Sequence, residues 1–297
     1  MNLFNLISKF LSADREKLKQ IDNYILLKKI NYGGMSEIYT AQDKNTAEMY
    51  ALKILLPSAV AREERLYEVF KEDRVEHSSS LLFEHPCIVK VYKTGRYKDL
   101  LYIVMELIKG YNLQEMYSER MPLTYKEKLG IFLDISRGVQ YLHKKEIVHN
   151  DINPKNIIVT LERKAKLIDF GIAVSVGSRM QKSGGIRSGT PAYMAPEQIK
   201  SQQVDYPTDI YNLGVTFYEL FAGTSPFSGR TPEEKMRSHL NEAPPDIMIK
   251  AADIDPDLGE LIMKCIRRDH QERIQNINDV CSVLEDLSRR EKREKFS

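Results

Sequence analysis

The chain has 297 residues, 42% of them hydrophobic and 29% charged, and 44 basic against 42 acidic residues give it a formal net charge of +2. This is the composition of an ordinary globular protein with enough chain to bury a core, and the balanced charge gives no support for nucleic-acid binding. Cys87, Cys265 and Cys281 are widely spaced, so neither a disulfide framework nor a zinc site is expected, and a reducing, cytoplasmic setting is predicted.

Residues 1–21 are predicted to form an amphipathic helical extension. The apolar residues at helical spacing are Leu3, Phe4, Ile7, Phe10 and Leu11. The segment lacks the basic start and unbroken apolar stretch of a secretion signal, and no apolar run reaches the roughly 18 to 20 residues that cross a bilayer. We expect it to dock on the body of the protein, with contact to a partner or a membrane surface as the alternative.

From Tyr24 to about Val104 the pattern predicts a small sheet with one helix. Its β-like runs are ILLKKI, EIYTAQ, EMYALKIL, CIVKVYKTG and LLYIVMEL. The charged stretch from about Arg62 to His77 is predicted to be the helix.

After Gly110 the pattern becomes helical. Residues 125–143 carry apolar side chains three or four apart, which predicts a helix with one buried face. The stretch Asp209–Phe221 is apolar nearly all round, as a helix at the centre of a domain must be. Residues 172–188 are rich in Gly, Ser and basic residues and are predicted to form a mobile loop, while 286–297 are predicted to be a charged tail.

Residues 31–39, NYGGMSEIY, lie between two β-like runs. Because glycine has no Cβ, Gly33 and Gly34 allow backbone amides to approach the oxygens of a phosphate. A glycine pair between strands is also a common hairpin turn, so this motif is weak by itself.

Lys53 lies in the alternating apolar run YALKIL. A lysine in such a strand is often exposed, but one that points into a cleft below the glycines would hold the α- and β-phosphates of a nucleotide. A buried ammonium group requires a carboxylate partner. Glu76 on the predicted helix is the first choice for that partner, and Glu72, one turn earlier, is the alternative.

Two later loops carry acids and an amide. VHNDINPKNIIV (148–159) places Asn156 five residues after Asp151, and LIDFGIA places Asp169 eighteen residues after Asp151. Asp151 is suited to orient a substrate hydroxyl and accept its proton, and Asn156 and Asp169 offer the oxygen ligands that magnesium prefers. Either loop alone is also typical of turn hydrogen bonding, but the two together indicate phosphoryl transfer.

The ordered motifs NYGGMSEIY, YALK, HNDINPKN, DFG, GTPAYMAPE and the apolar helix from Asp209 resemble the protein kinase superfamily, and within it the bacterial eukaryotic-like (Hanks-type) Ser/Thr kinases. The resemblance covers roughly residues 22–285. It implies an α+β fold with two lobes: a small β-rich N-lobe with one main helix over about 22–107, and a larger, mainly helical C-lobe over about 108–285. The active site is expected between them.

The resemblance implies transfer of the γ-phosphate of ATP to Ser and Thr hydroxyls of proteins, including autophosphorylation, with Mg²⁺ or Mn²⁺ as the ion. Lys53 would pair with Glu76, Asp151 would be the catalytic base, and Asn156 and Asp169 would bind the metal. In Ser/Thr kinases the Thr of GTPAYMAPE, here Thr190, contacts the catalytic Asp.

Ten positions correspond to the family's nucleotide site. They are Asn31, Gly33, Gly34, Ser36, Ile38, Ala51, Lys53, Met105, Glu106 and Ile108. Met105 resembles the gatekeeper, and the backbone at Glu106 and Ile108 would bind adenine. The resemblance further implies two structural contacts, a pair between Glu197 and Arg273, and Asp209 bracing the catalytic loop.

Some positions depart from the family pattern. Asn31 and Ser36 replace two loop glycines, and Asn tolerates positive φ better than most residues. Ser80 stands where an apolar residue is usual, which weakens the choice of Glu76. Asn150 replaces the Arg that commonly precedes the catalytic Asp, so a phosphorylated activation loop would lack its usual cationic partner, and activity independent of that phosphorylation is expected.

Asn153 replaces the Lys that steadies the γ-phosphate in Ser/Thr kinases. Lys155 lies four residues after Asp151, where many tyrosine kinases place a compensating Arg. We hypothesise that Lys155 supplies the missing charge.

Two alternatives remain open. The asparagines at 31, 150 and 153 favour a pseudokinase, a binding module without turnover, although Lys53 and the acids at 151 and 169 are all present. HNDINPKN without the usual Lys also resembles small-molecule phosphotransferases, against which GTPAYMAPE argues. In the activation loop, the candidate autophosphorylation sites are Ser175, Ser178, Ser183 and Ser188. No residue pattern indicates an oligomeric state.

Overall fold

The computed structural model describes residues 19–32, 36–55, 83–98, 100–169, 174–175 and 189–294, with the backbone alone at 31–32, 174–175 and 292–294. The chain divides into two compact units. The first runs to Glu84 and includes Lys90–Ile108, and the second contains His85–Val89 and the chain from Lys109 onward. The first is a sheet and the second is mainly helical, which confirms the expected α+β class.

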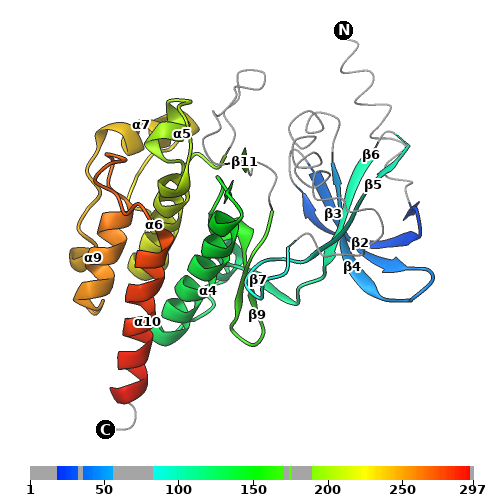
Figure 1. Cartoon of the computed structure of the whole chain (residues 1–297), viewed down its shortest axis with the longest axis horizontal. Helices are drawn as coiled ribbons and strands as arrows, with labels where there is room; N and C mark the ends of the chain where they lie inside the picture. The colour runs from blue at the N-terminus through cyan, green and yellow to red at the C-terminus, as the bar shows by residue number, and fades with distance from the viewer. Residues whose placement is uncertain are drawn as a thin grey trace. The chain divides into compact units, whose positions relative to one another are not determined.

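An antiparallel six-stranded sheet makes up most of the described part of the first unit (Figure 1). Its strands are β1 (Gln20–Ile21), β2 (Tyr24–Tyr32), β3 (Ser36–Asp43), β4 (Met49–Leu55), β5 (Val91–Tyr97) and β6 (Leu100–Glu106), in the order β1-β2-β3-β4-β6-β5. The strand side chains alternate between faces, and one face carries the core of this unit. That core comprises Ile21, Tyr24, Ala41, Leu52, Ile54, Leu100, Tyr102 and Val104.

The second unit contains eight described α-helices. They are α3 (Leu113–Ser118), α4 (Tyr125–Lys144), α5 (Pro196–Ile199), α6 (Tyr206–Ala222), α7 (Pro232–Asn241), α8 (Ile247–Lys250), α9 (Pro256–Cys265) and α10 (Ile277–Glu294). Its shorter elements are β7 (Gly110–Asn112), β8 (Ile147–Val148), the 3₁₀ turn η1 (Pro154–Asn156), β9 (Ile157–Thr160), β10 (Ala165–Leu167) and β11 (Val174–Ser175). No helix among the described residues is both long and apolar enough to span a bilayer.

The centre of the second unit is α6, as its all-round apolar sequence predicts. Nearly every residue of α6 is buried, and the rings of Phe217 on α6 and Phe132 on α4 stack with centroids 3.9 Å apart. Gly223, with φ of +72°, ends α6 in the left-handed conformation that glycine adopts without strain.

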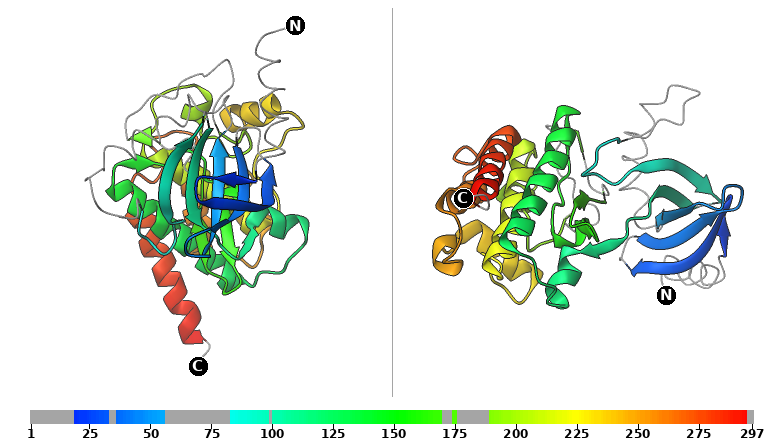
Figure 2. Two further views of the ribbon diagram at one scale, coloured as in Figure 1. Left: turned by 90° about the vertical axis from the view of Figure 1, so that its right-hand side faces the viewer. Right: turned by 90° about the horizontal axis from the view of Figure 1, so that it is seen from below.

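The last helix, α10, runs beside α4 (Figure 2). It continues to Glu294, and Leu287 is buried, so residues 286–294, which sequence reasoning assigned to a charged tail, extend this helix.

Three short strands of the second unit, in the order β10-β9-β7, form a small sheet that holds a separate stretch of chain. The N–H of Val89 donates to the carbonyl of Leu167 at 3.0 Å, and the N–H of Leu167 donates to the carbonyl of Cys87 at 2.8 Å. A Cβ at Gly138 of α4 would lie 3.1 Å from the Cys87 carbonyl oxygen, so glycine there permits the close approach. These contacts explain why His85–Val89 belong to the second unit.

A buried ion pair, expected from the sequence and confirmed here, joins α5 to the chain before α10. Arg273 Nη1 lies 2.8 Å from Glu197 Oε1, and Nη2 donates to Oε2 at 3.2 Å. Thr208 Oγ1 donates to Glu197 Oε1 at 2.9 Å, and Arg273 Nη1 donates to the carbonyl of Pro207 at 2.8 Å. Burial opposes ionisation of Glu197, but Arg273 outweighs it and lowers the pKa of the carboxyl.

Replacing Arg273 by Ala is expected to lower the free energy of unfolding by about 3–5 kcal/mol, because it leaves the Glu197 carboxylate buried without its cation. Urea denaturation followed by circular dichroism measures this loss. The control is Arg137→Ala, which breaks a pair with Glu285 of 2.8 Å whose side chains are 45% and 44% exposed, and which should cost about 1 kcal/mol or less. Equal losses in the two variants would contradict the structural role of the buried pair.

Candidate functional site

The loop His149–Asn156 is fixed to α6 through Asp209. This carboxylate is fully buried in the first turn of α6. The N–H of His149 donates to its Oδ2 and the N–H of Asn150 donates to its Oδ1, both at 2.8 Å, while Nε2 of His143 lies 2.9 Å from Oδ2. Hydrogen bonds to an ionised acceptor are about twice as strong as neutral ones. The sequence-expected bracing of this loop by Asp209 is therefore confirmed.

Both carboxylate oxygens of Asp151 have hydrogen-bond donors. Thr190 Oγ1 donates to Oδ1 at 2.9 Å and the N–H of Thr190 donates to the same oxygen at 3.1 Å. Asn156 Nδ2 donates to Oδ2 at 3.0 Å. Burial raises the pKa of the Asp151 carboxyl and the Asp169 carboxylate adds to this, while the bonds from Thr190 oppose the shift. The acid is thus held in one orientation with its basicity raised.

Asn156 and Asp169 are brought together by the β9–β10 hairpin. Leu167 pairs with Ile157 across the hairpin, and the N–H of Ile168 donates to the carbonyl of Asn156 at 2.8 Å. The side-chain Nδ2 of Asn156 donates to Asp151, both to its carbonyl at 2.8 Å and to its carboxylate. The amide oxygen of Asn156 is therefore the side-chain atom suited to a cation.

The donor set fits a divalent ion such as Mg²⁺. Burial, and to a smaller extent the negative charge of Asp169, raise the pKa of the Asp151 carboxyl. The Asn156 amide is hydrogen-bonded to the same carboxylate. Carboxylate and amide oxygens are the ligands that Mg²⁺ prefers, and a dication relieves repulsion between neighbouring acids.

Two residues of this site have a left-handed backbone. Asn150 and Asp169 both have φ of +65°. Asn and Asp are the non-glycine residues that adopt this conformation most readily. The strained conformations are maintained by the contacts around them, as is common at functional sites.

Asn153 has a bridging role that sequence reasoning missed. Its buried side chain donates through Nδ2 to the carbonyl of Asp151 at 3.0 Å and to Thr190 Oγ1 at 3.2 Å, and its Oδ1 accepts the N–H of Lys155 at 3.0 Å. The side chain of Lys155 is exposed.

The chain Thr190–Ala195, which we name the 190–195 segment, is held by residues that the sequence did not single out. His239 Nε2 donates to the carbonyl of Ala192 at 3.0 Å, which leaves its Nδ1 to accept the hydroxyl of Tyr211 at 2.8 Å. Burial lowers the pKa of His239 to about 4, so the ring is neutral. Asn212 Nδ2 donates to the carbonyl of Tyr193 at 2.6 Å.

In the first unit, strand register gathers several nucleotide-site candidates on one face of the sheet. Lys53 pairs with Ile38 on β3, and Ala51 pairs with Met105 on β6. Directly paired residues of antiparallel strands point to the same face, and so do residues two apart on one strand. These four side chains and that of Ser36, which pairs with Leu55, therefore share the face opposite the core. Lys53 is only 5% exposed.

The end of β6 is fixed within the first unit. The N–H of Glu106 donates to the carbonyl of Lys90 at 2.9 Å, and Ile108 follows in irregular backbone. Asn31 lies in β2 opposite Ile38. Other candidates lie outside the described residues: they are Gly33, Gly34, Glu72, Glu76, Ser80, Ser178, Ser183 and Ser188.

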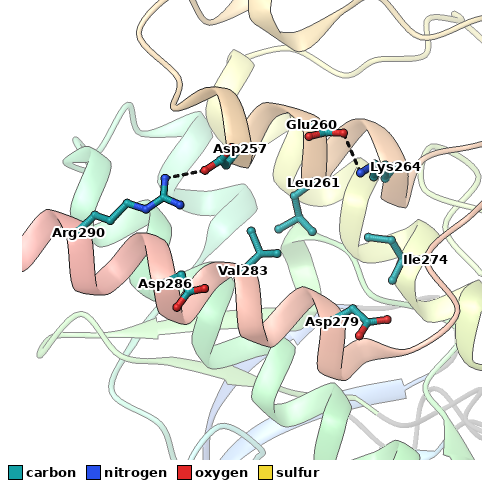
Figure 3. Close-up of a pocket in the computed structure, with 9 residues that line it drawn as sticks. All are labelled: Asp257, Glu260, Leu261, Lys264, Ile274, Asp279, Val283, Asp286 and Arg290. Carbon is teal, nitrogen blue, oxygen red and sulfur yellow. Dashed lines mark hydrogen bonds and ion pairs between the residues drawn. The ribbon is translucent and has the colours of Figure 1, made fainter.

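A groove of about 360 Å³ lies between α9 and α10, and none of the candidate site residues lines it (Figure 3). Its acidic residues are largely engaged by nearby bases. Asp257 lies 2.6 Å from Arg290, and Glu260 lies 2.7 Å from Lys264. Because its lining residues include none of the candidate site residues, the groove is separate from the site around Asp151.

Residues 24–284 match the family model described as the protein kinase domain. A probable serine/threonine-protein kinase of Clostridium perfringens is 32% identical over 270 residues, which cover 90% of this chain and 38% of the relative. Serine/threonine-protein kinase PknB of Mycolicibacterium smegmatis is 31% identical, with coverage of 89% and 42%. A probable serine/threonine-protein kinase of Streptomyces coelicolor is 32% identical, with coverage of 84% and 37%. The chain thus spans about two fifths of the length of these relatives.

Replacing Asp209 by Asn is expected to accelerate hydrogen exchange at the His149 or Asn150 amide, because the new NH₂ group cannot accept one of the two N–H bonds. A charge-assisted bond contributes about 1.5–3 kcal/mol, so exchange should rise on the order of 10- to 100-fold. Exchange measured by mass spectrometry or NMR checks this. Asp205→Asn, at the N-cap of the same helix and paired with His270 at 2.7 Å, should leave the loop unchanged. Equal exchange in all three proteins would refute the bracing role.

Proposed function

This chain belongs to the protein kinase domain family, and from that premise we propose that it transfers the γ-phosphate of ATP to Ser and Thr hydroxyls of proteins. The observation that carries the proposal is the orientation of Asp151 by Thr190 and Asn156. Both oxygens of this acid are held by donors, and a general base must be held within reach of the proton that it accepts.

Asp151 orients the acceptor hydroxyl and accepts its proton. Asn156 and Asp169 would hold Mg²⁺, and the bound ion would supply positive charge to the phosphates. Lys53, a buried ammonium on the sheet face of Ala51 and Ile38, binds the α- and β-phosphates, with Glu76 as its proposed partner. Catalysis of this kind depends on positioning and charge rather than on covalent chemistry.

The preference for Ser and Thr acceptors is supported by the relatives, which carry the name serine/threonine-protein kinase. It is also supported by the contact of Thr190 with Asp151. We further propose autophosphorylation in the chain between Asp169 and Thr190, and a cytoplasmic location.

The Asp151→Asn variant is expected to transfer phosphate 10²- to 10⁴-fold more slowly than the parent, because it lacks the proton acceptor. The measurement is Mg²⁺-dependent transfer of labelled γ-phosphate from ATP to a generic Ser/Thr protein substrate. Nucleotide binding by calorimetry should survive in the variant. If the parent binds Mg-ATP but transfers no phosphate, the chain is a pseudokinase instead, and an equally active variant would exclude Asp151 as the base.

Lys155→Ala is expected to lower turnover on the order of 30- to 1000-fold, by analogy with removal of another group that stabilises transition-state charge. Lys155→Arg, which keeps the charge, should retain most activity. The matched control is Lys126→Ala, which removes another exposed lysine from the same unit. Turnover of Lys155→Ala within a factor of two of the parent would disprove the compensation hypothesis.

A further inference from the structure

Gln198 is a buried side chain that bonds to three separate parts of the second unit. Its Nε2 donates to the carbonyl of Asn150 at 2.7 Å. Its Oε1 accepts the N–H of Ala195 at 2.8 Å and Nδ2 of Asn212 at 2.9 Å. Only 1% of the Gln198 surface is exposed. One amide group therefore joins the His149–Asn156 loop, the 190–195 segment and α6.

These bonds require a neutral group that offers both a donor and an acceptor. A donor must face the Asn150 carbonyl, and an acceptor must face the other two groups. An aliphatic side chain of the same size would leave three buried polar groups without their partner, and an ionised Glu would present an acceptor to the Asn150 carbonyl. The position thus needs one donor and one acceptor in a fixed arrangement.

The peptide groups of Asn150 are held from two sides. Its N–H donates to Asp209 and its carbonyl accepts from Gln198. The backbone of Asn150 is left-handed, so these two bonds oppose relaxation of a strained conformation. A change in the ψ angle of Asn150 would turn the chain that follows it, and with it the Asp151 side chain that contacts Thr190. Gln198 therefore holds the peptide group that directly precedes Asp151, without touching the acid itself.

No charge takes part in the link that Gln198 makes. Asn150 has no cationic side chain to pair with a phosphorylated residue, and neutral amides tie its loop to the 190–195 segment instead. We propose that Gln198 is a positioning residue that holds Asp151 beside the 190–195 segment and so makes the loop competent without a phosphorylated activation segment. This inference rests on the proposed kinase activity.

Steady-state kinetics of phosphatase-treated parent, Gln198→Leu and Gln198→Glu test the proposal. Gln198→Leu should lower kcat on the order of 10- to 100-fold, the effect of displacing a reacting group by about 1 Å, while KM for ATP changes less than threefold. The exposed Gln203→Leu is the matched control and should match the parent.

The Gln198→Glu variant adds a readout that a purely structural role would not move. Its protonated carboxyl carries an O–H for the Asn150 carbonyl and an oxygen for the other two donors, whereas its ionised form has no donor. The ratio of its kcat to that of the parent should therefore rise as the pH is lowered from 8 to 6. If Gln198→Leu fails to fold, the pH dependence of this ratio tests the positioning role by itself. A ratio that does not vary with pH overturns the proposal.

Other outcomes are equally decisive. Unchanged kcat in a folded Gln198→Leu overturns the positioning role, and a parent that is inactive after phosphatase treatment but active after rephosphorylation overturns independence from phosphate. A parent that transfers no phosphate in either state refutes the proposed function instead. In that case hydrogen exchange at the Ala195 amide still tests whether Gln198 holds the 190–195 segment. Faster exchange in Gln198→Leu than in the parent supports this role, and equal exchange refutes it.

Discussion

A single buried carboxylate determines the geometry of the candidate site. Asp209 lies in an apolar helix, where an ionised group is tolerated only when donors surround it. The donors are two consecutive backbone amides, those of His149 and Asn150, together with the His143 ring. Because nearly all of α6 is buried, a loop bonded to it is attached to a well-packed part of the unit. Asp151 follows directly, and its position is therefore set from the centre of the unit.

Neutral side chains hold the same loop through further hydrogen bonds. Gln198 holds the carbonyl of Asn150, and Asn153 links the carbonyl of Asp151 to the Thr190 hydroxyl. Such bonds are individually modest, near 1 kcal/mol net, but leaving a buried partner unpaired costs more than the bond contributes. A network of this kind therefore favours one arrangement of its groups over all others. This suits an acid whose orientation matters for proton transfer.

In the first unit, the register and alternation of the strands place the candidate nucleotide-binding side chains. Lys53 and Ala51 alternate with Leu52 and Ile54 along β4, so core residues on one face force the lysine onto the other. The face of the sheet on which Lys53 lies is thus set by the same alternation that builds the hydrophobic core. An apolar strand with one lysine at a position that alternates with the core residues is enough to produce this placement.

The sequence by itself determined the α+β class, the long helices and the identity of the candidate acids, because apolar periodicity and motif spacing are local properties of the chain. Only the tertiary structure decided the roles of Gln198, Asn153 and His239. Each is a polar residue with one hydrogen-bond partner 37 to 48 positions away, and hydrogen bonds between distant segments leave no periodic trace. Strands of three residues such as β7 and β10 were also beyond sequence reasoning, since alternation cannot be recognised over so few positions, and their pairing with β9 defines them.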